Sequence, residues 1–169
     1  PWRGCQRISP GCKNCYMFSE QLRYGQDPSV VVRTKTWKDP VKWNKSAAER
    51  GVRELVFTCS WSDWFHKDAD PWRDEAWDVI RSCPNLIFQI LTKRPERIRD
   101  HLPANWREGY RNVWLGVSVE DRKHGLPRID ILRDVPAWIR FLSIEPLLER
   151  LGAANFGGIH WVIIGGESG

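Results

Sequence analysis

No segment of this 169-residue sequence is apolar for long enough to cross a membrane, and none has the pattern of a secretory signal. We therefore expect a cytoplasmic protein with no membrane partner. Cysteines are few, five in all, and their pattern fits a reducing compartment rather than a disulfide framework. Neither sign of charge dominates, because 26 Lys and Arg against 21 Asp and Glu leave a net charge of +5. This mild excess permits an anionic partner without requiring one.

The composition is that of an ordinary globular domain with one core, with 41% hydrophobic and 28% charged residues. Eleven tryptophans are unusual, and we expect most of them in the core and a few near a site, where they could stack on bases. The sequence begins at Pro1 without Met and stops at Gly169 directly after a strand-like run. We therefore expect both ends to be cut from a longer protein.

Three of the five cysteines lie together near the start of the chain. Cys5, Cys12 and Cys15 have the spacing C-x6-C-x2-C, in a polar loop that ends at a tyrosine. A buried structural cysteine is usually single and has apolar neighbours, as Cys59 and Cys83 have. A disulfide would pair two of the three and leave one over. A metal or iron–sulfur site uses all three, so this is the reading that the spacing favours over a redox disulfide or a structural role.

Three thiolates do not saturate an iron–sulfur cluster, which normally has four cysteine ligands. The site therefore recruits a distant ligand or leaves one iron open for chemistry. The second arrangement is that of radical SAM enzymes, in which the open iron of a [4Fe–4S] cluster chelates S-adenosylmethionine (SAM). Their usual spacing is C-x3-C-x2-C, so the first gap is longer here. A predicted helix over Met17–Tyr24 places Cys15 near a helix N-terminus, whose dipole favours an anionic cluster.

Short apolar runs then alternate with helical segments along the rest of the chain. Such runs read as parallel strands buried on both faces, and a (β/α) barrel or partial barrel closes them. We expect one barrel-like domain over residues 1–169, with the cysteine loop at its N-terminus. A capping box is expected at Ser46–Glu49, and a short helix after Pro146. The expected strands are Glu54–Cys59, Leu86–Leu91, Val113–Val117, Trp138–Leu142 and Ile159–Ile164, and the expected helices between them are Trp72–Cys83, Glu96–Leu102 and Gly125–Arg133.

Polar side chains follow each of these strands. In barrels the carboxyl ends of the strands form the active face, so we expect a shared site that the cysteine loop also reaches. Single residues have simpler explanations: a serine or aspartate at such a place is as often a helix cap, and a lone lysine or histidine is more often solvated. The polar strand ends are Ser62, Asp63 and His66; Thr92, Lys93 and Arg94; Ser118 and Glu120; Ser143 and Glu145; and Glu167 and Ser168.

Six blocks of sequence resemble a phage and mobile-element family named after phage gene products 37 and 68, whose genomic neighbours are three-Cys-motif partner proteins. These blocks are GCxxxSPGCxNCY, SxSDxFH, LTKRPER, GVSVE, SIEPLLE and the terminal GGESG, and together they span nearly the whole chain. The family is regarded as radical-SAM-like, and its pattern continues past GGESG. The resemblance implies a partner protein of the three-Cys-motif type and a [4Fe–4S] cluster with SAM as cofactors.

The resemblance to radical SAM enzymes implies that Cys5, Cys12 and Cys15 are the cluster ligands. In those enzymes a GGE-like segment after the second strand receives the SAM amino group. The corresponding loop here reads SWSD, which departs from that pattern. Asp63 is the residue of this loop that we expect to accept the ammonium group.

Further roles follow from the same resemblance. Residues that end the fourth strand often contact the ribose, which suits Ser118 and Glu120. Lys93 or Arg94 would neutralise the methionyl carboxylate or bind a substrate phosphate. The candidates for a general acid or base are Glu145 and Glu167.

The sequence thus predicts a radical-SAM-like enzyme with an unidentified substrate. The phage-like resemblance, the net charge and the basic segment Lys93–Arg99 point to a nucleic acid or nucleotide. One alternative is a non-catalytic zinc or iron–sulfur module that binds DNA, with His66 or Cys59 as fourth ligand. Another is a metal-dependent hydrolase that uses Asp63, His66 and Glu145, which leaves the three thiolates unexplained.

Overall fold

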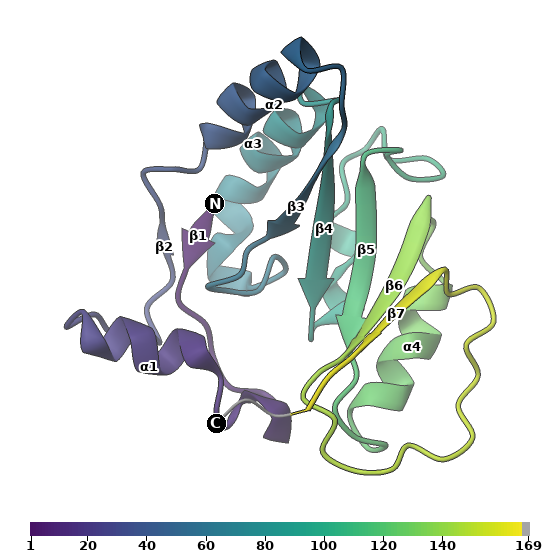
Figure 1. Ribbon diagram of the computed structural model, residues 1–169. Coiled ribbons are helices and arrows are strands. Elements are labelled where there is room, and N and C mark those ends of the chain that lie inside the picture. The colour runs from purple at the N-terminus through teal and green to yellow at the C-terminus, as the bar shows by residue number, and fades with distance from the viewer. Residues whose placement is uncertain (167–169) are drawn as a thin grey trace.

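The computed structural model describes residues 1–166 and contains a five-stranded parallel sheet (Figure 1). The strands lie in chain order, each paired with the next, and the sheet curls into a half-barrel. The prediction of parallel strands in a partial barrel is therefore confirmed. The strands are β3 (Glu54–Thr58), β4 (Leu86–Thr92), β5 (Val113–Ser118), β6 (Ile139–Ile144) and β7 (Trp161–Ile164).

Three helices pack against the sheet: α2 (Asp39–Glu49), α3 (Asp70–Arg81) and α4 (Gly125–Arg133). The core lies between them and the convex face of the sheet. On β4, for example, Phe88 and Ile90 are buried in this core, and the alternate residues Ile87 and Leu91 face the concave side and are only partly buried. The helices thus close one face of the sheet and leave the concave face accessible.

The N-terminal segment lies beside the carboxyl ends of the strands, toward which the arrowheads in Figure 1 point. It forms β1 (Trp2–Arg3), which pairs in antiparallel fashion with β2 (Val32–Arg33). The cysteine loop follows β1, contains a 3₁₀ turn at Pro10–Cys12 and leads into α1 (Tyr16–Arg23). This arrangement puts the cysteines at the face of the half-barrel where the polar strand ends gather.

Several local predictions were wrong. The segment expected as the helix Glu96–Leu102 forms two 3₁₀ turns, η3 (Pro95–Arg97) and η4 (Arg99–His101). The S-A-A-E box at Ser46–Glu49 lies in the last turn of α2 rather than at a helix start, because α2 begins earlier, at an Asp-Pro pair. The described chain between β6 and β7 contains no helix, contrary to the one expected after Pro146.

Strand β3 is less buried than its apolar sequence predicted. It forms one edge of the described sheet, and Leu55 and Phe57 on its concave side are 54% and 50% exposed. Only alternate residues of this strand pack against the core, because successive side chains point to opposite faces and the helices cover only the convex one. In that same part of the chain, none of the helices has the length and apolar character that a membrane crossing requires.

Candidate functional site

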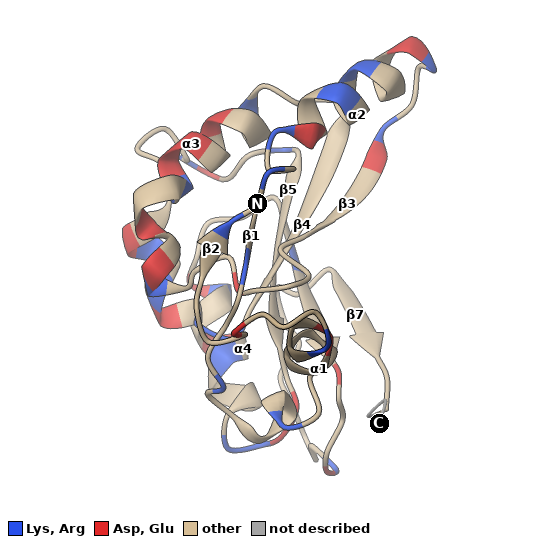
Figure 2. Ribbon diagram, turned by 90° about the vertical axis from the view of Figure 1, so that its left-hand side faces the viewer, with Lys and Arg blue, Asp and Glu red and all other residues tan. Residues whose placement is uncertain are grey.

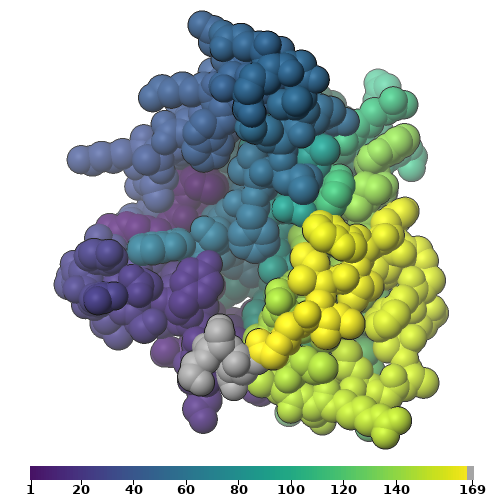
Figure 3. All heavy atoms as spheres, viewed as in Figure 1, coloured from purple at the N-terminus to yellow at the C-terminus, as the bar shows by residue number. Residues whose placement is uncertain are grey.

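A cavity of about 440 Å³ lies at the carboxyl ends of the strands, between the cysteine loop and the sheet. Figure 3 shows the surface hollowed between the purple N-terminal segment and the yellow end of the chain. The structure thus brings residues from the two ends of the sequence together with the strand ends between them. The predicted site residues that line the cavity are Cys5, Cys12, Cys15, Asp63, Lys93, Arg94, Ser118 and Glu145.

Backbone contacts fix the cysteine loop against the loop after β3. The Gly4 N–H donates to the Trp61 carbonyl at 3.0 Å, and the Cys5 N–H donates to the Pro28 carbonyl at 2.8 Å. At the far end of the loop, the Tyr16 hydroxyl donates to the Ser60 carbonyl at 2.6 Å. The loop is therefore held at both ends against neighbouring segments of the chain.

The three loop cysteines are free thiols in different local settings. Cys12 is buried in the 3₁₀ turn, with its Sγ 3.8 Å from the hydroxyl of Ser9. Cys15 is the N-cap residue of α1, as the sequence predicted, and is partly exposed. Burial raises the pKa of the Cys5 thiol to about 11, even though the neighbouring Arg94 opposes this effect.

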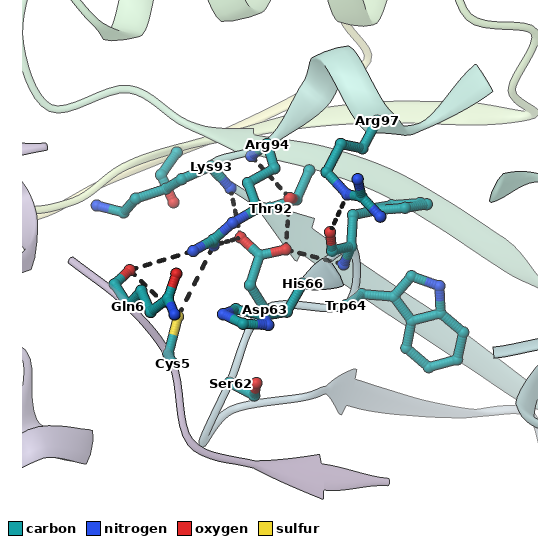
Figure 4. A network of polar contacts seen from close by, with 12 residues as sticks. Cys5, Gln6, Ser62, Asp63, Trp64, His66, Thr92, Lys93, Arg94 and Arg97 are labelled. Atoms are coloured by element: carbon teal, nitrogen blue, oxygen red, sulfur yellow. Dashed lines mark hydrogen bonds and ion pairs between the residues drawn. The ribbon is translucent and has the colours of Figure 1, made fainter. Parts of the chain in front are cut away.

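Asp63 is the centre of a network of polar contacts (Figure 4). Its Oδ1 accepts from the Phe65 N–H at 2.9 Å and from the Thr92 hydroxyl at 2.7 Å. Its Oδ2 accepts from the Lys93 N–H at 2.9 Å and from the Arg94 guanidinium at 3.0 Å. Four donors use the four lone-pair sites of a carboxylate, so little capacity is left for the ammonium group that the sequence assigned to Asp63.

Arg94 joins this network to the cysteine loop. Its guanidinium lies 3.8 Å from Cys5 Sγ and donates to the Gln6 carbonyl at 3.2 Å and to Asp63 at 3.0 Å. Burial alone would lower the pKa of Arg94, but the nearby Asp63 and Cys5 reverse this effect and raise it. The buried Arg94 side chain is thus engaged within the protein, which leaves Lys93, whose Nζ lies 3.7 Å from Glu120, as the other basic group of the cavity lining.

Lys93 lines the cavity, whereas its neighbour Glu120 is not part of the cavity lining. Glu120 is fully buried, with its Oε2 2.6 Å from the Arg128 guanidinium and 3.7 Å from Lys93 Nζ. Its Oε1 has no partner among the described residues. Gly11 of the cysteine loop fits tightly here, because a Cβ on it would lie 3.0 Å from both Glu120 and Lys93. Glu120 therefore packs against Gly11 of the cysteine loop. Its predicted contact with a ribose stays a prediction.

Glu145 is the acidic lining residue with acceptor capacity to spare. It follows β6, and within the described chain its side-chain hydrogen bond is the one from the Ser143 hydroxyl at 3.2 Å. Gly165 approaches it so closely that a Cβ there would lie 2.2 Å from Glu145 Oε1. Glu167, the other residue predicted as a general acid or base, lies outside the described residues.

The donor geometry bears on which metal group the cysteines could hold. Residues 1–166 contain no group of three His, Cys, Asp or Glu side chains placed to hold a single metal ion. A single zinc ion needs such convergence, since its four ligands surround one point. In a [4Fe–4S] cluster each cysteine binds a different iron, so the sulfurs can be spread over a cavity wall. The three free thiols of the loop line one cavity, an arrangement that a cluster could use without such convergence.

Of the two fourth ligands considered for a zinc site, Cys59 lines the cavity and His66 does not. His66 is fully buried, and its Nδ1 accepts from the Asp68 N–H at 3.2 Å. Burial lowers the pKa of this imidazole. Cys59 is also buried, with its Sγ 3.9 Å from the Trp2 carbonyl, and burial raises its pKa to about 12. Neither side chain lies in a group with the loop cysteines that could bind one ion.

The basic segment Lys93–Arg99 is less available to an anionic partner than its sequence indicated. Arg97 donates to the Phe65 carbonyl at 2.7 Å and to Asp70 at 2.8 Å, and Arg99 donates to the Asp134 carbonyl. Figure 2 shows acidic residues interspersed with basic ones along α2 and α3, rather than one broad cationic face.

Sequence reasoning missed the apolar part of the cavity wall. Phe57, Phe141 and Ile163 line it, together with Tyr16 of the cysteine loop. The signal was present for the strand residues, because Phe141 and Ile163 lie on the concave face that the alternation of β6 and β7 defines. An apolar wall opposite Lys93 and the hydroxyl groups suits a ligand with both a ring system and polar groups.

Comparison with known proteins identifies a family whose model matches this chain. One family model matches residues 1–169, that of DUF5131, described as a protein of unknown function. No curated protein and no solved structure matches the chain.

Proposed function

The chain belongs to the DUF5131 family, and we propose that it is a radical-SAM-like iron–sulfur protein whose cavity holds a [4Fe–4S] cluster and SAM. One observation supports the proposal above all. Three free cysteines from a single loop line the same cavity as polar side chains from the ends of β4 and β5 and from the segment after β6. A parallel half-barrel collects these groups at one face, as in enzymes whose catalytic residues end barrel strands.

The roles of the protein's own residues follow from the contacts. Cys5, Cys12 and Cys15 would hold the cluster. Together with SAM, the cluster would supply the reductive cleavage of a carbon–sulfur bond, in which one electron from an external donor gives methionine and a 5′-deoxyadenosyl radical. That radical would take a hydrogen atom from a substrate. Lys93 offers an ammonium group for a carboxylate at the cavity wall. Glu145 is better placed than the saturated Asp63 to accept an ammonium group.

We propose, from the same resemblance, that this is a phage-type protein and that it acts with a three-Cys-motif partner protein. The zinc module is less favoured, because its donors do not converge on one point in residues 1–166. The metal-dependent hydrolase is less favoured for the same reason, since Asp63, His66 and Glu145 form no such group, and the Asp63 carboxylate already accepts from four donors.

The test is iron binding followed by product analysis. Protein made anaerobically and reconstituted should be brown and bind about four irons per chain, the content of one [4Fe–4S] cluster. With a reductant and SAM it should release 5′-deoxyadenosine. Stoichiometric zinc without iron uptake would overturn the cluster, and iron uptake without 5′-deoxyadenosine would overturn the SAM chemistry.

A matched pair of cysteine variants sharpens the iron measurement. Cys12→Ala should abolish iron binding, because it removes a sulfur from the cavity wall. Cys83→Ala should bind iron as the wild type does, since Cys83 is fully buried in the hydrophobic core and does not line the cavity. Equal iron content in the two variants would contradict the ligand assignment.

A nucleic acid or nucleotide remains our proposed substrate class, and salt dependence tests its phosphate contacts. If Lys93 and Arg94 contact phosphates, replacing both with Gln should reduce the slope of log affinity against log salt by roughly two charges. If they serve the cofactor instead, the variant should lose SAM binding and leave DNA affinity nearly unchanged. Because Arg94 is already bonded within the protein and Lys93 lines the proposed cofactor cavity, we expect the second result, with Lys93 as the residue that matters for SAM.

A further inference from the structure

The three loop cysteines differ in the charge beside their sulfurs. Within residues 1–166, Cys5 alone of the three has a charged group at hydrogen-bond distance from its sulfur, namely the Arg94 guanidinium at 3.8 Å. The sulfur of Cys12 has only the neutral hydroxyl of Ser9, also at 3.8 Å. A cluster held by the three thiolates would therefore be asymmetric, with positive charge next to one ligand.

Arg94 cannot move freely, because three acceptors surround its guanidinium. Its Nη1 lies between Cys5 Sγ and Asp63 Oδ2, and its Nη2 donates to the Gln6 carbonyl. Asp63 is fixed in turn by the Thr92 hydroxyl and two backbone N–H groups. Figure 4 shows this chain of contacts running from the end of β4 to the cysteine loop.

Stability alone is a weak explanation for this arrangement. Arg94 and Asp63 are only 7% and 5% exposed, and the cost of desolvating both charges offsets much of their mutual attraction. What the pair provides is geometry, since a guanidinium held in a fork directs its remaining N–H groups at a fixed point. That point is the sulfur of Cys5 and the backbone next to it.

We propose that the Asp63–Arg94 pair positions Cys5 for cluster binding and raises the reduction potential of the bound cluster. Hydrogen bonds and positive charge at a ligating sulfur stabilise the reduced, more negative state of an iron–sulfur cluster. Arg94 supplies both at the sulfur of Cys5. The inference rests on the proposed function, because it presupposes the cluster.

Two variants of Arg94 separate the two effects. Arg94→Gln removes the charge and the fork, and should lose iron to a chelator faster and have a midpoint potential more negative than the wild type. Arg94→Lys keeps the charge but cannot contact Cys5, Gln6 and Asp63 together, so it should lose iron faster at a nearly unchanged potential. Iron release is followed by absorbance and the potential by a redox titration monitored by electron paramagnetic resonance.

The control is Arg97→Gln, which removes an arginine of the same segment that bonds to Phe65 and Asp70 and has no contact with a cysteine. It should match the wild type in both measurements. Iron release from both Arg94 variants at the rate of Arg97→Gln would overturn the positioning role, and an unchanged potential in Arg94→Gln would overturn the electrostatic one. If Arg94→Gln does not fold, iron release from Arg94→Lys against Arg97→Gln decides the positioning role. Absence of iron from the wild type and every variant would instead count against the proposed function.

Discussion

Gly4 determines where Cys5 can lie. Its φ of +93° falls in the region that favours glycine, and a Cβ at this position would lie 2.2 Å from the Val30 carbonyl oxygen. The next residue is Cys5, whose N–H bonds to the Pro28 carbonyl. The backbone at Gly4 and Cys5 is therefore packed against the segment 28–31.

Replacing this glycine should be costly for two separate reasons. Gly4→Ala imposes left-handed strain and a backbone clash, whereas Gly51→Ala, at φ +64° with open space around it, imposes the strain alone. We expect the control to lose about 1 kcal/mol of unfolding free energy and Gly4→Ala clearly more. Urea denaturation measures both, and equal losses would contradict the clash.

The sequence was enough to predict which residue types line the site, but not which hydrogen-bond and ion-pair partners those side chains have. Asp63, Arg94 and Glu120 were recognised as polar strand-end residues. Their partners lie far along the chain, as with Asp63 and Arg94, which are 31 positions apart. Whether a carboxylate is saturated or free depends on such tertiary contacts, so the sequence assigned ligand roles to side chains that the fold uses internally.

At the scale of elements, β5 and β6 meet closely on the concave face. Gly116 of β5 lies beneath the ring of Phe141 on β6, and a Cβ on Gly116 would lie 2.5 Å from that ring. The absence of a side chain on β5 therefore lets the aromatic ring lie flat against the sheet and form part of the cavity wall.

Gly116→Ala should overpack this contact and destabilise the fold by about 1–3 kcal/mol. Because the clash is with one side chain, Phe141→Leu should cost less in the Gly116→Ala background than in the wild type. Thermal or urea unfolding of the two single variants and the double variant gives the coupling free energy. Strict additivity would show that the strain lies elsewhere.

The elements that the sequence predicted well are those whose pattern alone decides their structure. Continuous apolar runs predicted β4, β5 and β6 because most residues of these strands are buried, although the helices cover only the convex face. The segment 96–102 was misread because its side chains serve tertiary contacts: Arg97 and His101 both reach Asp70. Such anchoring overrides a local helical preference and yields two short turns.

At the scale of the whole molecule, Asp70 links distant parts of the chain. It begins α3 and pairs with Arg73 at 2.6 Å, and it also pairs with Arg97 at 2.8 Å in the turns after β4. Burial alone would raise the pKa of this carboxyl, but the two guanidinium groups outweigh it and the pKa is lowered.

A carboxyl with a lowered pKa stabilises the fold above its unfolded pKa of about 4, and this contribution is lost as the pH falls through the folded value. We therefore expect Asp70→Asn to be less stable than the wild type at pH 7 and the difference to shrink below pH 4. Urea unfolding at several pH values measures it. A difference independent of pH would show that the charge of Asp70 is not what the fold uses.

The tryptophans of the core form a row that begins at the site. The Trp2 indole donates to the Asp63 carbonyl at 3.0 Å, and Trp2, Trp64, Trp77 and Trp106 follow with successive ring centroids 4.9, 4.9 and 5.4 Å apart. Rings this close exchange excitation, so light absorbed by any of the four can reach Trp2, the ring that bonds to the Asp63 backbone at the site. A coloured group bound among the cysteines would capture that energy and dim the emission. The intrinsic fluorescence of the protein should therefore report the filling of the cavity, with no label and no change to the site.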